Sequence, residues 1–123
     1  MLSIEILPQR LSVCKVEHLA GFDLSAGLCF VAVTDRELSL VCESERVPDS
    51  PLAREDGWRA MRVAGSLDFS LTGILSRVSG ALAEAGIPIF ALSTYDTDYV
   101  LVKGECLERA AEALRAAGIE IQS

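Results

Sequence analysis

The sequence predicts an α+β fold, and two observations in the second half of the chain support that prediction. Apolar residues recur at helical spacing from Leu71 to Ala85, and again from about Glu105 to Ala117. Strand-like apolar runs flank both segments, and these runs are Trp58 to Val63, Ile87 to Leu92, Tyr99 to Lys103 and Ile119 to Ile121. The resulting order is β-α-β-β-α-β, which is the split βαβ or ferredoxin-like arrangement.

Both predicted helices end on the same short pattern, Ala-Gly-Ile, at residues 85–87 and 117–119. Glycine is favoured just past the last turn of a helix, so Gly86 and Gly118 are the expected stops. The repeat indicates two strand–helix–strand units in tandem, or else only a common way of ending helices. The predicted order of elements is the same in either case.

The first half of the chain predicts strands without full-length helices. The expected strands are Leu2 to Leu7, interrupted at Pro8, then Leu11 to Val16, Leu28 to Val33 and Leu38 to Cys42, the last two forming a hairpin. Residues 43–57 are polar and contain two prolines, which predicts a connector. We therefore expect one unit at residues 1–57 and a second at 58–123.

Composition narrows the classes of function. The chain has 123 residues, of which 50% are hydrophobic, enough for one compact domain or two small halves sharing a core. A formal charge of −7 argues against nucleic acid and anionic membranes as partners. No run is long enough to cross a membrane and no secretory signal is visible, so a cytoplasmic protein is expected.

The cysteines and the single histidine do not predict a metal site. Cys14, Cys29, Cys42 and Cys106 include no C-x-x-C pair, and His18 is the one histidine. The first three lie in apolar runs and are expected to be small buried hydrophobes in a reducing compartment. A Cys–His nucleophile pair that uses His18 stays open, although nothing local supports it. No metal and no other cofactor is expected.

The most informative stretch is the polar tip at residues 93–98, between two apolar strands. It holds two acids and three serine or threonine residues but no glycine, which is more hydrogen-bonding capacity than a hairpin turn requires. The surplus indicates one wall of a site for a small polar ligand. A solvated turn is the alternative, because Asp and Thr are ordinary turn residues.

Residues 65–73 lead from a strand into the first helix. Ser70 or Thr72 can cap this helix, leaving N–H groups near Gly73 and Ile74 that can hold a carboxylate or a phosphate. A well-capped helix with no ligand is the alternative. The glycines fit neither a P-loop nor the dinucleotide fingerprint.

Signals of catalysis are weak. There is no G-x-S-x-G elbow, and the separation of Asp68, Asp96 and Asp98 does not follow from sequence. An acylphosphatase would share the strand order, but its Arg-plus-Asn chemistry is discounted because the chain has no asparagine. An RNA-recognition module is discounted because the strands are aliphatic and the protein is acidic. We therefore do not expect an enzyme.

Three segments together resemble an ACT domain: residues 67–75 (LDFSLTGIL), 82–87 (LAEAGI) and 89–102 (IFALSTYDTDYVLV). Within that superfamily the chain is similar to small stand-alone bacterial ACT proteins related to the ACT modules of aspartate kinases and of an animal cytosolic arginine sensor. Residues 30–34 and 37–42 are similar to the degenerate N-terminal ACT-like half of that group. The resemblance implies a ferredoxin-like ACT unit preceded by a strand-rich, degenerate half.

The resemblance also implies regulation, with a free amino acid bound at an interface between ACT units. Carried over by position, one wall of the site is Asp68, Ser70, Thr72, Gly73 and Ile74, and the other is Ser93, Thr94, Asp96 and Asp98. Helix-start N–H groups suit an α-carboxylate, and the acids suit an ammonium or a basic side chain. An enzyme regulated by the module is a possible partner. The alternative is an ACT module that has lost its ligand and serves a structural or partner-binding role.

Assembly is the last expectation. Residues 87–92 and 99–102 are apolar on both faces, whereas helices in this fold cover only one face of the sheet. The second face is then covered by the N-terminal strands or by a second copy of the chain. Because symmetric dimers are the commonest oligomers, we expect a homodimer.

Overall fold

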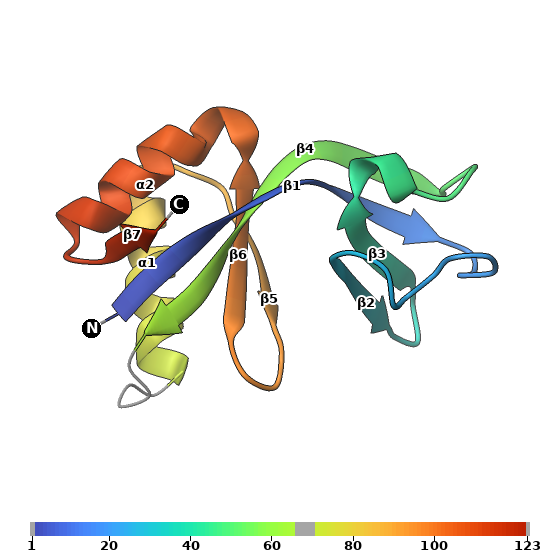
Figure 1. The fold of residues 1–123 in the computed structure, drawn as a ribbon, viewed down its shortest axis with the longest axis horizontal. Coiled ribbons are helices and arrows are strands. Elements are labelled where there is room, and N and C mark those ends of the chain that lie inside the picture. The colour runs from blue at the N-terminus through green and yellow to red at the C-terminus, as the bar shows by residue number, and fades with distance from the viewer. Residues whose placement is uncertain (1, 66–70, 123) are drawn as a thin grey trace. The chain divides into compact units, whose positions relative to one another are not determined.

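The structure, a computed structural model, describes residues 2–65 and 71–122 and confirms the predicted α+β class (Figure 1). The strands and helices, with two short 3-10 turns, follow in the order β1 (Leu2–Val16), β2 (Cys29–Val33), β3 (Leu38–Glu43), η1 (Ser44–Arg46), β4 (Ala53–Gly65), α1 (Leu71–Glu84), β5 (Phe90–Ser93), β6 (Asp98–Lys103), η2 (Gly104–Cys106), α2 (Leu107–Ala116) and β7 (Glu120–Gln122).

The chain divides into two compact units. We call Met1–Pro8 together with Arg59–Ser123 the helical unit, and Gln9–Trp58 the strand unit. The long strands β1 and β4 each contribute one part to either unit. The expected domain boundary between residues 57 and 58 stays a prediction. Within the compact units, the first eight residues group with the second half of the chain rather than with the first.

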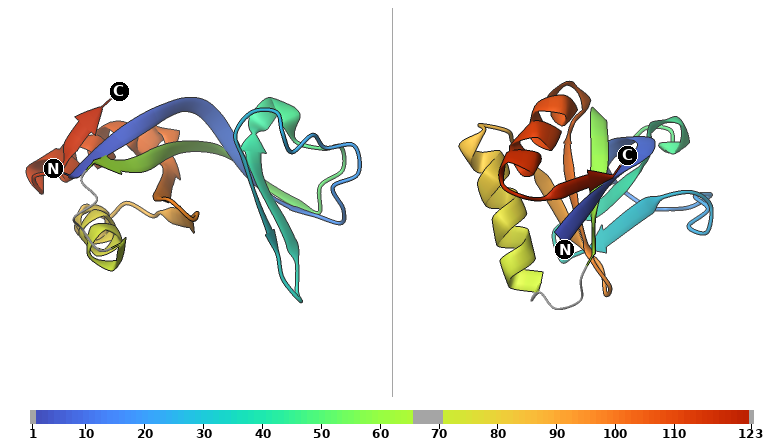
Figure 2. Two further views of the ribbon diagram at one scale, coloured as in Figure 1. Left: turned by 60° about the horizontal axis from the view of Figure 1, so that its bottom comes forward. Right: turned by 60° about the vertical axis from the view of Figure 1, so that its left-hand side comes forward.

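In the helical unit the strands follow the order β7-β1-β4-β6-β5. Ser3–Glu5 of β1 pairs in parallel with Glu120–Gln122 of β7, so β1 lies between β7 and β4. Both helices cover one face of these strands (Figures 1 and 2). The element order β4-α1-β5-β6-α2-β7 is the predicted β-α-β-β-α-β, with one additional strand inserted from the start of the chain.

The core of the helical unit forms between the two helices and the sheet. In α1 the buried residues Ile74, Val78 and Leu82 recur every four positions, so one stripe of the helix faces the strands. The other buried members of this core are Leu2, Ile4, Met61, Val63, Ile87, Val100, Val102, Ala110, Leu114 and Ile119. Burial of this apolar surface is the main force that holds α1 and α2 on the sheet.

Both helices end in the same hydrogen-bonded motif, as their shared Ala-Gly-Ile pattern predicts. Gly86 and Gly118 take positive φ angles of 73° and 85°, which side chains with a Cβ rarely adopt. The N–H of Ile87 then donates to Leu82 O at 3.0 Å, and the N–H of Ile119 donates to Leu114 O at 3.0 Å. Both isoleucines are buried, so the same motif ends each helix and anchors the chain that follows it.

The strand unit follows the order β2-β3-β1-β4, with Leu11–Val16 of β1 antiparallel to β3 and β2 antiparallel to β3. Its sequence of elements is strand, irregular loop, strand, strand, 3-10 turn and strand. The loop at residues 17–28 and the turn η1 occupy the places in the order that α1 and α2 occupy in the helical unit. This half is therefore a strand-rich version of the same pattern without full helices, as predicted.

The loop that replaces a helix in the strand unit is held by two charged side chains. Arg46 of η1 donates from Nη2 to Asp23 O at 2.5 Å, and its guanidinium stacks 4.6 Å from the centre of the Phe22 ring. Glu43 accepts the N–H of Leu28 at 2.9 Å. These contacts satisfy backbone groups that a helix would have satisfied internally.

Two strands begin three or more residues away from their predicted starts. β4 begins at Ala53 and not at Trp58, so the connector is shorter than expected. Residues 53–57 are exposed, mostly polar and show no alternation of apolar and polar side chains. Their strand structure comes from pairing with β1, which cannot be predicted from the local sequence pattern. β5 begins at Phe90 and not at Ile87. Ile87 instead completes the cap of α1 and is buried in the core, and Pro88 follows it.

The interruption expected at Pro8 is wrong, because β1 runs unbroken from Leu2 to Val16. On one side of β1, β7 pairs with residues 3–5 and β3 pairs with residues 11–16. Pro8 falls in the gap between these two ladders, where a residue without an N–H is tolerated.

Candidate functional site

The hairpin β5–β6 carries the candidate site, and its turn is built by a threonine hydroxyl. Thr94 N donates to Thr97 O at 2.8 Å. The Thr94 hydroxyl accepts the N–H of Thr97 at 3.3 Å and lies 3.1 Å from Thr97 O, to which it donates. This local bonding closes the turn without glycine. The hydroxyl of Thr94 is thereby used by the turn itself.

A second threonine fixes the hairpin to the neighbouring strand. Thr97 Oγ1 donates to Val63 O at 2.7 Å, near the end of β4. β4 and β6 are adjacent in the sheet, so this bond continues their pairing into the turn. The polar tip is therefore held against the strand that leads to α1.

Ser93 and Asp98 form the polar pair at the base of the turn. They are direct partners in the β5–β6 register, and Ser93 Oγ donates to Asp98 Oδ1 at 2.5 Å. Asp98 is only 3% exposed, yet its second oxygen, Oδ2, is buried and accepts no hydrogen bond from the described residues. A buried carboxylate with one unsatisfied oxygen is costly, because it has lost water without gaining a full set of donors.

The pleat of β6 shows which face Asp98 occupies. Alternate residues of a strand share a face, so Asp98 lies on the same face as Val100 and Val102. Both valines belong to the core that includes Ile74, in the first turn of α1. The start of α1 and the β5–β6 tip lie at the same end of the helical unit in both views (Figures 1 and 2). The carboxylate thus lies at the edge of the helix-covered face.

The structure places the predicted site residues unevenly. Asp68 and Ser70 lie outside the described residues, and so does the side chain of Thr72. Of the first wall, Gly73 is exposed in the first turn of α1, whereas Ile74 is 5% exposed and part of the core.

In the second wall the structure joins Ser93 to Asp98 and gives Thr94 to the turn. Asp96 is exposed at the tip, next to Tyr95, which is 97% exposed. The geometry of these residues does not test whether they bind a ligand, so their role in binding stays a prediction.

The arrangement at the hairpin can recognise a positive charge. A carboxylate oxygen that accepts no hydrogen bond from the described part of the chain can accept a strong, charge-assisted hydrogen bond from an ammonium or guanidinium group. The first N–H groups of a helix lack partners within the helix and attract a carboxylate. A zwitterionic ligand presents both charges, which suits a site bounded by these two features.

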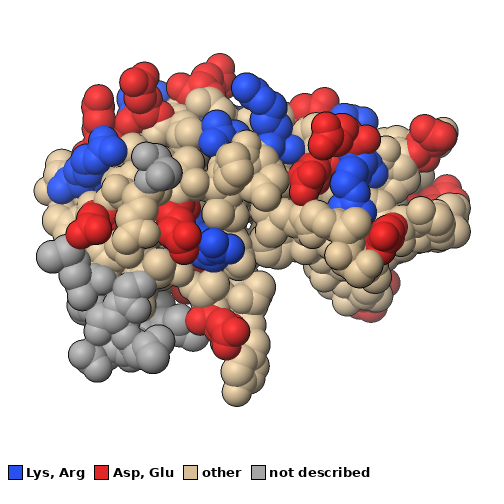
Figure 3. All heavy atoms as spheres, in the orientation of Figure 1, with Lys and Arg blue, Asp and Glu red and all other residues tan. Residues whose placement is uncertain are grey.

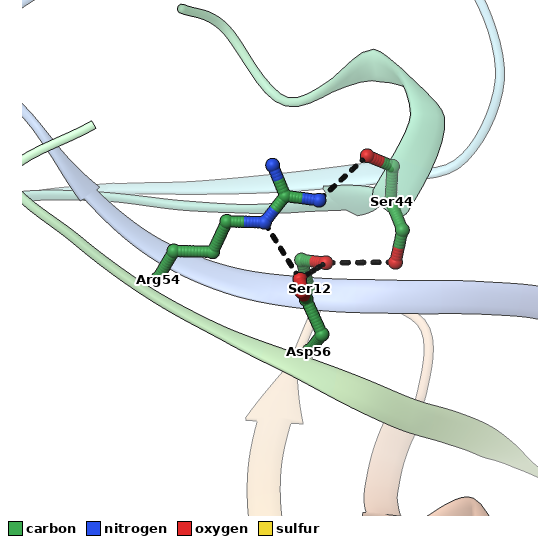
Figure 4. Close-up of polar contacts among 4 residues, drawn as sticks. All are labelled: Ser12, Ser44, Arg54 and Asp56. Atoms are coloured by element: carbon green, nitrogen blue, oxygen red, sulfur yellow. Dashed lines mark hydrogen bonds and ion pairs between the residues drawn. The ribbon is translucent and has the colours of Figure 1, made fainter. Parts of the chain in front are cut away.

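A second polar cluster, in the strand unit, was not predicted from sequence (Figure 4). Ser12 is fully buried in β1, and its hydroxyl donates to Asp56 Oδ1 at 2.5 Å and lies 2.7 Å from Ser44 Oγ. Arg54 donates from Nε to Asp56 Oδ1 at 2.7 Å and from Nη2 to Ser44 O at 3.1 Å. The cluster fastens η1 to β1 and β4. The Arg54-x-Asp56 spacing was its one visible signal in the sequence.

Other features of the described residues bear on function. They contain no group of three or more His, Cys, Asp or Glu side chains placed to hold a metal ion. None of the described helices is long and apolar enough to span a bilayer. On the face shown in Figure 3 acidic and basic side chains are interspersed, and no basic stripe is visible.

The fold defines an α+β module built on a β-α-β-β-α-β unit, and comparisons with known proteins identify its family. The model of the ACT domain family matches residues 53–116. The chain therefore belongs to the ACT domain family. The match extends over β4, α1, β5, β6 and α2, which include the candidate site.

Individual relatives agree with that assignment. A bovine (Bos taurus) protein named "Cytosolic arginine sensor for mTORC1 subunit 1" is 30% identical over 108 residues, which are 80% of this chain and 33% of the relative. The chain thus spans about a third of that relative's length. The crystal structure of an Agrobacterium tumefaciens protein superposes with a TM-score of 0.89 at 31% identity, covering 98% of this chain and 91% of the other.

A more distant structure shares the fold alone. The regulatory subunit of aspartate kinase from Thermus thermophilus has a TM-score of 0.65 at 12% identity, covering 94% of this chain and 97% of that chain. The relation to the ACT modules of aspartate kinases that the sequence indicates is confirmed at the level of fold.

Proposed function

We propose that the chain is a non-catalytic regulatory module that binds a free amino acid beside the β5–β6 hairpin, with Asp98 receiving the ligand's positively charged group. The observation that carries the proposal is the buried Oδ2 of Asp98, which accepts no hydrogen bond from the described residues. A cationic group seated there would offset the cost of burying the carboxylate.

Two further points support the proposal. Ser93 donates to Oδ1, which fixes the carboxylate so that Oδ2 remains available to a ligand. The family match and the bovine relative named as an arginine sensor favour an amino acid as the ligand. The α-carboxylate of such a ligand would lie toward the first turn of α1, because the N-terminal end of a helix favours a negative charge.

A thermal-shift screen of the whole chain against the twenty amino acids, beginning with arginine, tests the proposal. A ligand present at a hundred times its dissociation constant stabilises the native state by about 2.7 kcal/mol, which raises Tm by roughly 5–15 °C. If no amino acid at millimolar concentration changes Tm, the site is vestigial. The alternative of a structural or partner-binding ACT module then replaces the proposal.

A matched pair of variants assigns the site. Asp98→Asn keeps the size of the side chain and the bond from Ser93 but removes the charge, so it should abolish the shift while the protein stays folded. Asp96→Asn makes the same chemical change at the exposed tip and measures how far the ligand reaches along the turn. A shift that survives both substitutions and a Thr72→Ala change would place the ligand elsewhere.

We propose further that the chain forms a homodimer through an edge of its sheet. The strand order begins at β2 and ends at β5. β2 contains no charged residue, and its side chains Val31 and Val33 are 38% and 77% exposed. An apolar edge of this kind favours pairing with another strand. Light scattering at micromolar concentration should give a dimer mass that falls to the monomer mass in Val33→Lys.

A further inference from the structure

Three of the four cysteines meet in the apolar core of the strand unit. Cys14 and Cys42 are 3% and 0% exposed, and Cys29 is partly buried against them. Leu19 and Phe22 of the loop at residues 17–28 pack against the same cluster. All of the cysteines are free thiols. The regulatory function proposed above uses none of them.

The register of the β2–β3 hairpin makes two of these cysteines direct partners. Cys29 on β2 lies opposite Cys42 on β3. At the turn, Thr34 N donates to Glu37 O at 3.0 Å, so this pair is a hydrogen-bonded pair of the ladder. The two kinds of pair alternate along an antiparallel ladder, and the fifth pair beyond the turn, Cys29 with Cys42, is therefore a non-hydrogen-bonded pair.

That kind of pair brings side chains close together. The Cα atoms of a non-hydrogen-bonded pair are about 4.5 Å apart, and both side chains leave the sheet on the same face. A disulfide spans Cα atoms roughly 4.4–6.8 Å apart. The two thiols can therefore be joined with little movement of the backbone. On the other side of β3, the residue of β1 that lies opposite Cys42 is Ser12. Cys14 lies two residues further along β1, opposite Leu40.

The two partners differ in access. Cys29 is partly exposed, and its Sγ donates to Leu24 O at 3.7 Å, on a loop residue that is itself 55% exposed. Cys42 is fully buried, and burial raises the pKa of its thiol to about 11. A small oxidant therefore reaches Cys29 first, and Cys42 remains a protonated thiol beside it.

We propose that Cys29 and Cys42 form a site of reversible oxidation, in which hydrogen peroxide converts the two thiols into a cross-strand disulfide. The Cys29 thiolate attacks one oxygen of the peroxide, and the O–O bond breaks. The products are a sulfenic acid on Cys29 and hydroxide, which takes up a proton as water.

The sulfur of Cys42 then attacks the sulfur of this sulfenic acid. The S–S bond forms, the S–O bond breaks, and the leaving hydroxide takes the proton of the Cys42 thiol as a second water. Two thiols are oxidised by two electrons, and one peroxide is reduced to two waters. A thiol reductant reverses the step by exchange.

Peptide mapping of the whole protein after peroxide treatment, with the remaining thiols blocked, tests the site. Trypsin separates the four cysteines into four different peptides, because it cleaves after Lys15, Arg36, Arg46 and Lys103 and at least one of these sites lies between any two consecutive cysteines. The expected product links peptide 16–36 to peptide 37–46 and dissociates on reduction. Four free thiols after treatment, or a link from Cys42 to the peptide of Cys14, would overturn the proposal.

Matched serine variants and a second measurement complete the test. Cys29→Ser should abolish the link, whereas Cys14→Ser and Cys106→Ser should leave it intact. The crosslink restrains the hairpin, so oxidation should raise Tm by roughly 5–15 °C in the wild type and leave Cys29→Ser unchanged. If oxidation lowers Tm in the wild type, the pair does not have the geometry inferred from the register.

Discussion

The two hairpins of the molecule share a frame and differ in what they present. In β2–β3, Thr34 N donates to Glu37 O at 3.0 Å, and in β5–β6, Thr94 N donates to Thr97 O at 2.8 Å. In both, the threonine hydroxyl also bonds the backbone across the turn. Each hairpin is followed directly by a 3-10 turn, η1 or η2.

The two hairpins differ in the pair of residues that lies next to the turn. Val33 faces Leu38 in the strand unit, and Ser93 faces Asp98 at the same place in the helical unit. Threonine at the turn is therefore a structural device common to both halves and does not indicate a ligand. The pair of exposed Ser93 and buried Asp98 is not needed to form the turn, because a hairpin of the same frame is built without it.

The largest effect is expected from moving the polar pair to the other hairpin. Val33→Ser with Leu38→Asp should destabilise the protein by about 2–4 kcal/mol, because Leu38 packs against the apolar cysteine cluster and a carboxylate in its place would lose that packing and be desolvated there. Urea unfolding followed by the fluorescence of Trp58 measures this change. Val33→Ser alone, at a side chain that is 77% exposed in the single chain, should change the free energy of unfolding of the monomer by less than about 0.5 kcal/mol.

Alkaline pH should affect the strand unit through the buried thiol of Cys42. The pKa of Cys42 is raised from 9.0 to about 11 by burial. Its unfolded-state thiol ionises first as pH rises, so stability present below pH 9 is lost between pH 9 and about 11, by up to about 2–3 kcal/mol.

Unfolding of wild type and Cys42→Val across this window isolates that loss. Val102 is the residue at the corresponding place in β6, so the variant makes the two strands alike at this position. Equal pH dependence in the two proteins would assign the alkaline instability to other groups.

The smallest effect on stability is expected from the reverse exchange. Ser93→Val with Asp98→Leu should leave the free energy of unfolding within about 1 kcal/mol of the wild type or raise it, because the buried carboxylate of Asp98 and the hydroxyl that donates to it are replaced together. The same double variant should lose every amino-acid-induced shift in Tm. A variant that keeps the shift would remove the functional distinction between the hairpins.

The sequence predicted those elements whose signals are local. The stripe of α1 and the glycine ends of both helices follow from side chains a few residues apart. The first five residues of β4 did not, since Ala53 to Gly57 are exposed and hold their strand only through a partner distant in sequence. The insertion of β1 beside β7 is likewise a contact over more than a hundred residues, which no local pattern carries.

At the candidate site the sequence predicted the kinds of residue but not their separate roles. Ser93, Thr94, Asp96 and Asp98 were equivalent as a polar run. Register and burial distinguish them, because one acid lies across the ladder from a serine and under the helices while the other is exposed at the tip. The alternation of side chains along a strand has a period of two, so the different faces of neighbouring positions could have been predicted from the sequence. The burial of Asp98 depends on packing between distant segments and could not have been predicted.

The strand β1 inserted between β7 and β4 has a consequence for dissecting the protein. The segment that matches the family model, residues 53–116, lacks both Leu2–Pro8 and β7, and its expression alone would leave the edge of β4 without a neighbour. Such a truncated fragment should aggregate or stay unfolded. Supplying residues 1–52 as a separate peptide to residues 53–123 should restore folding, since the missing strand would then return by complementation between fragments.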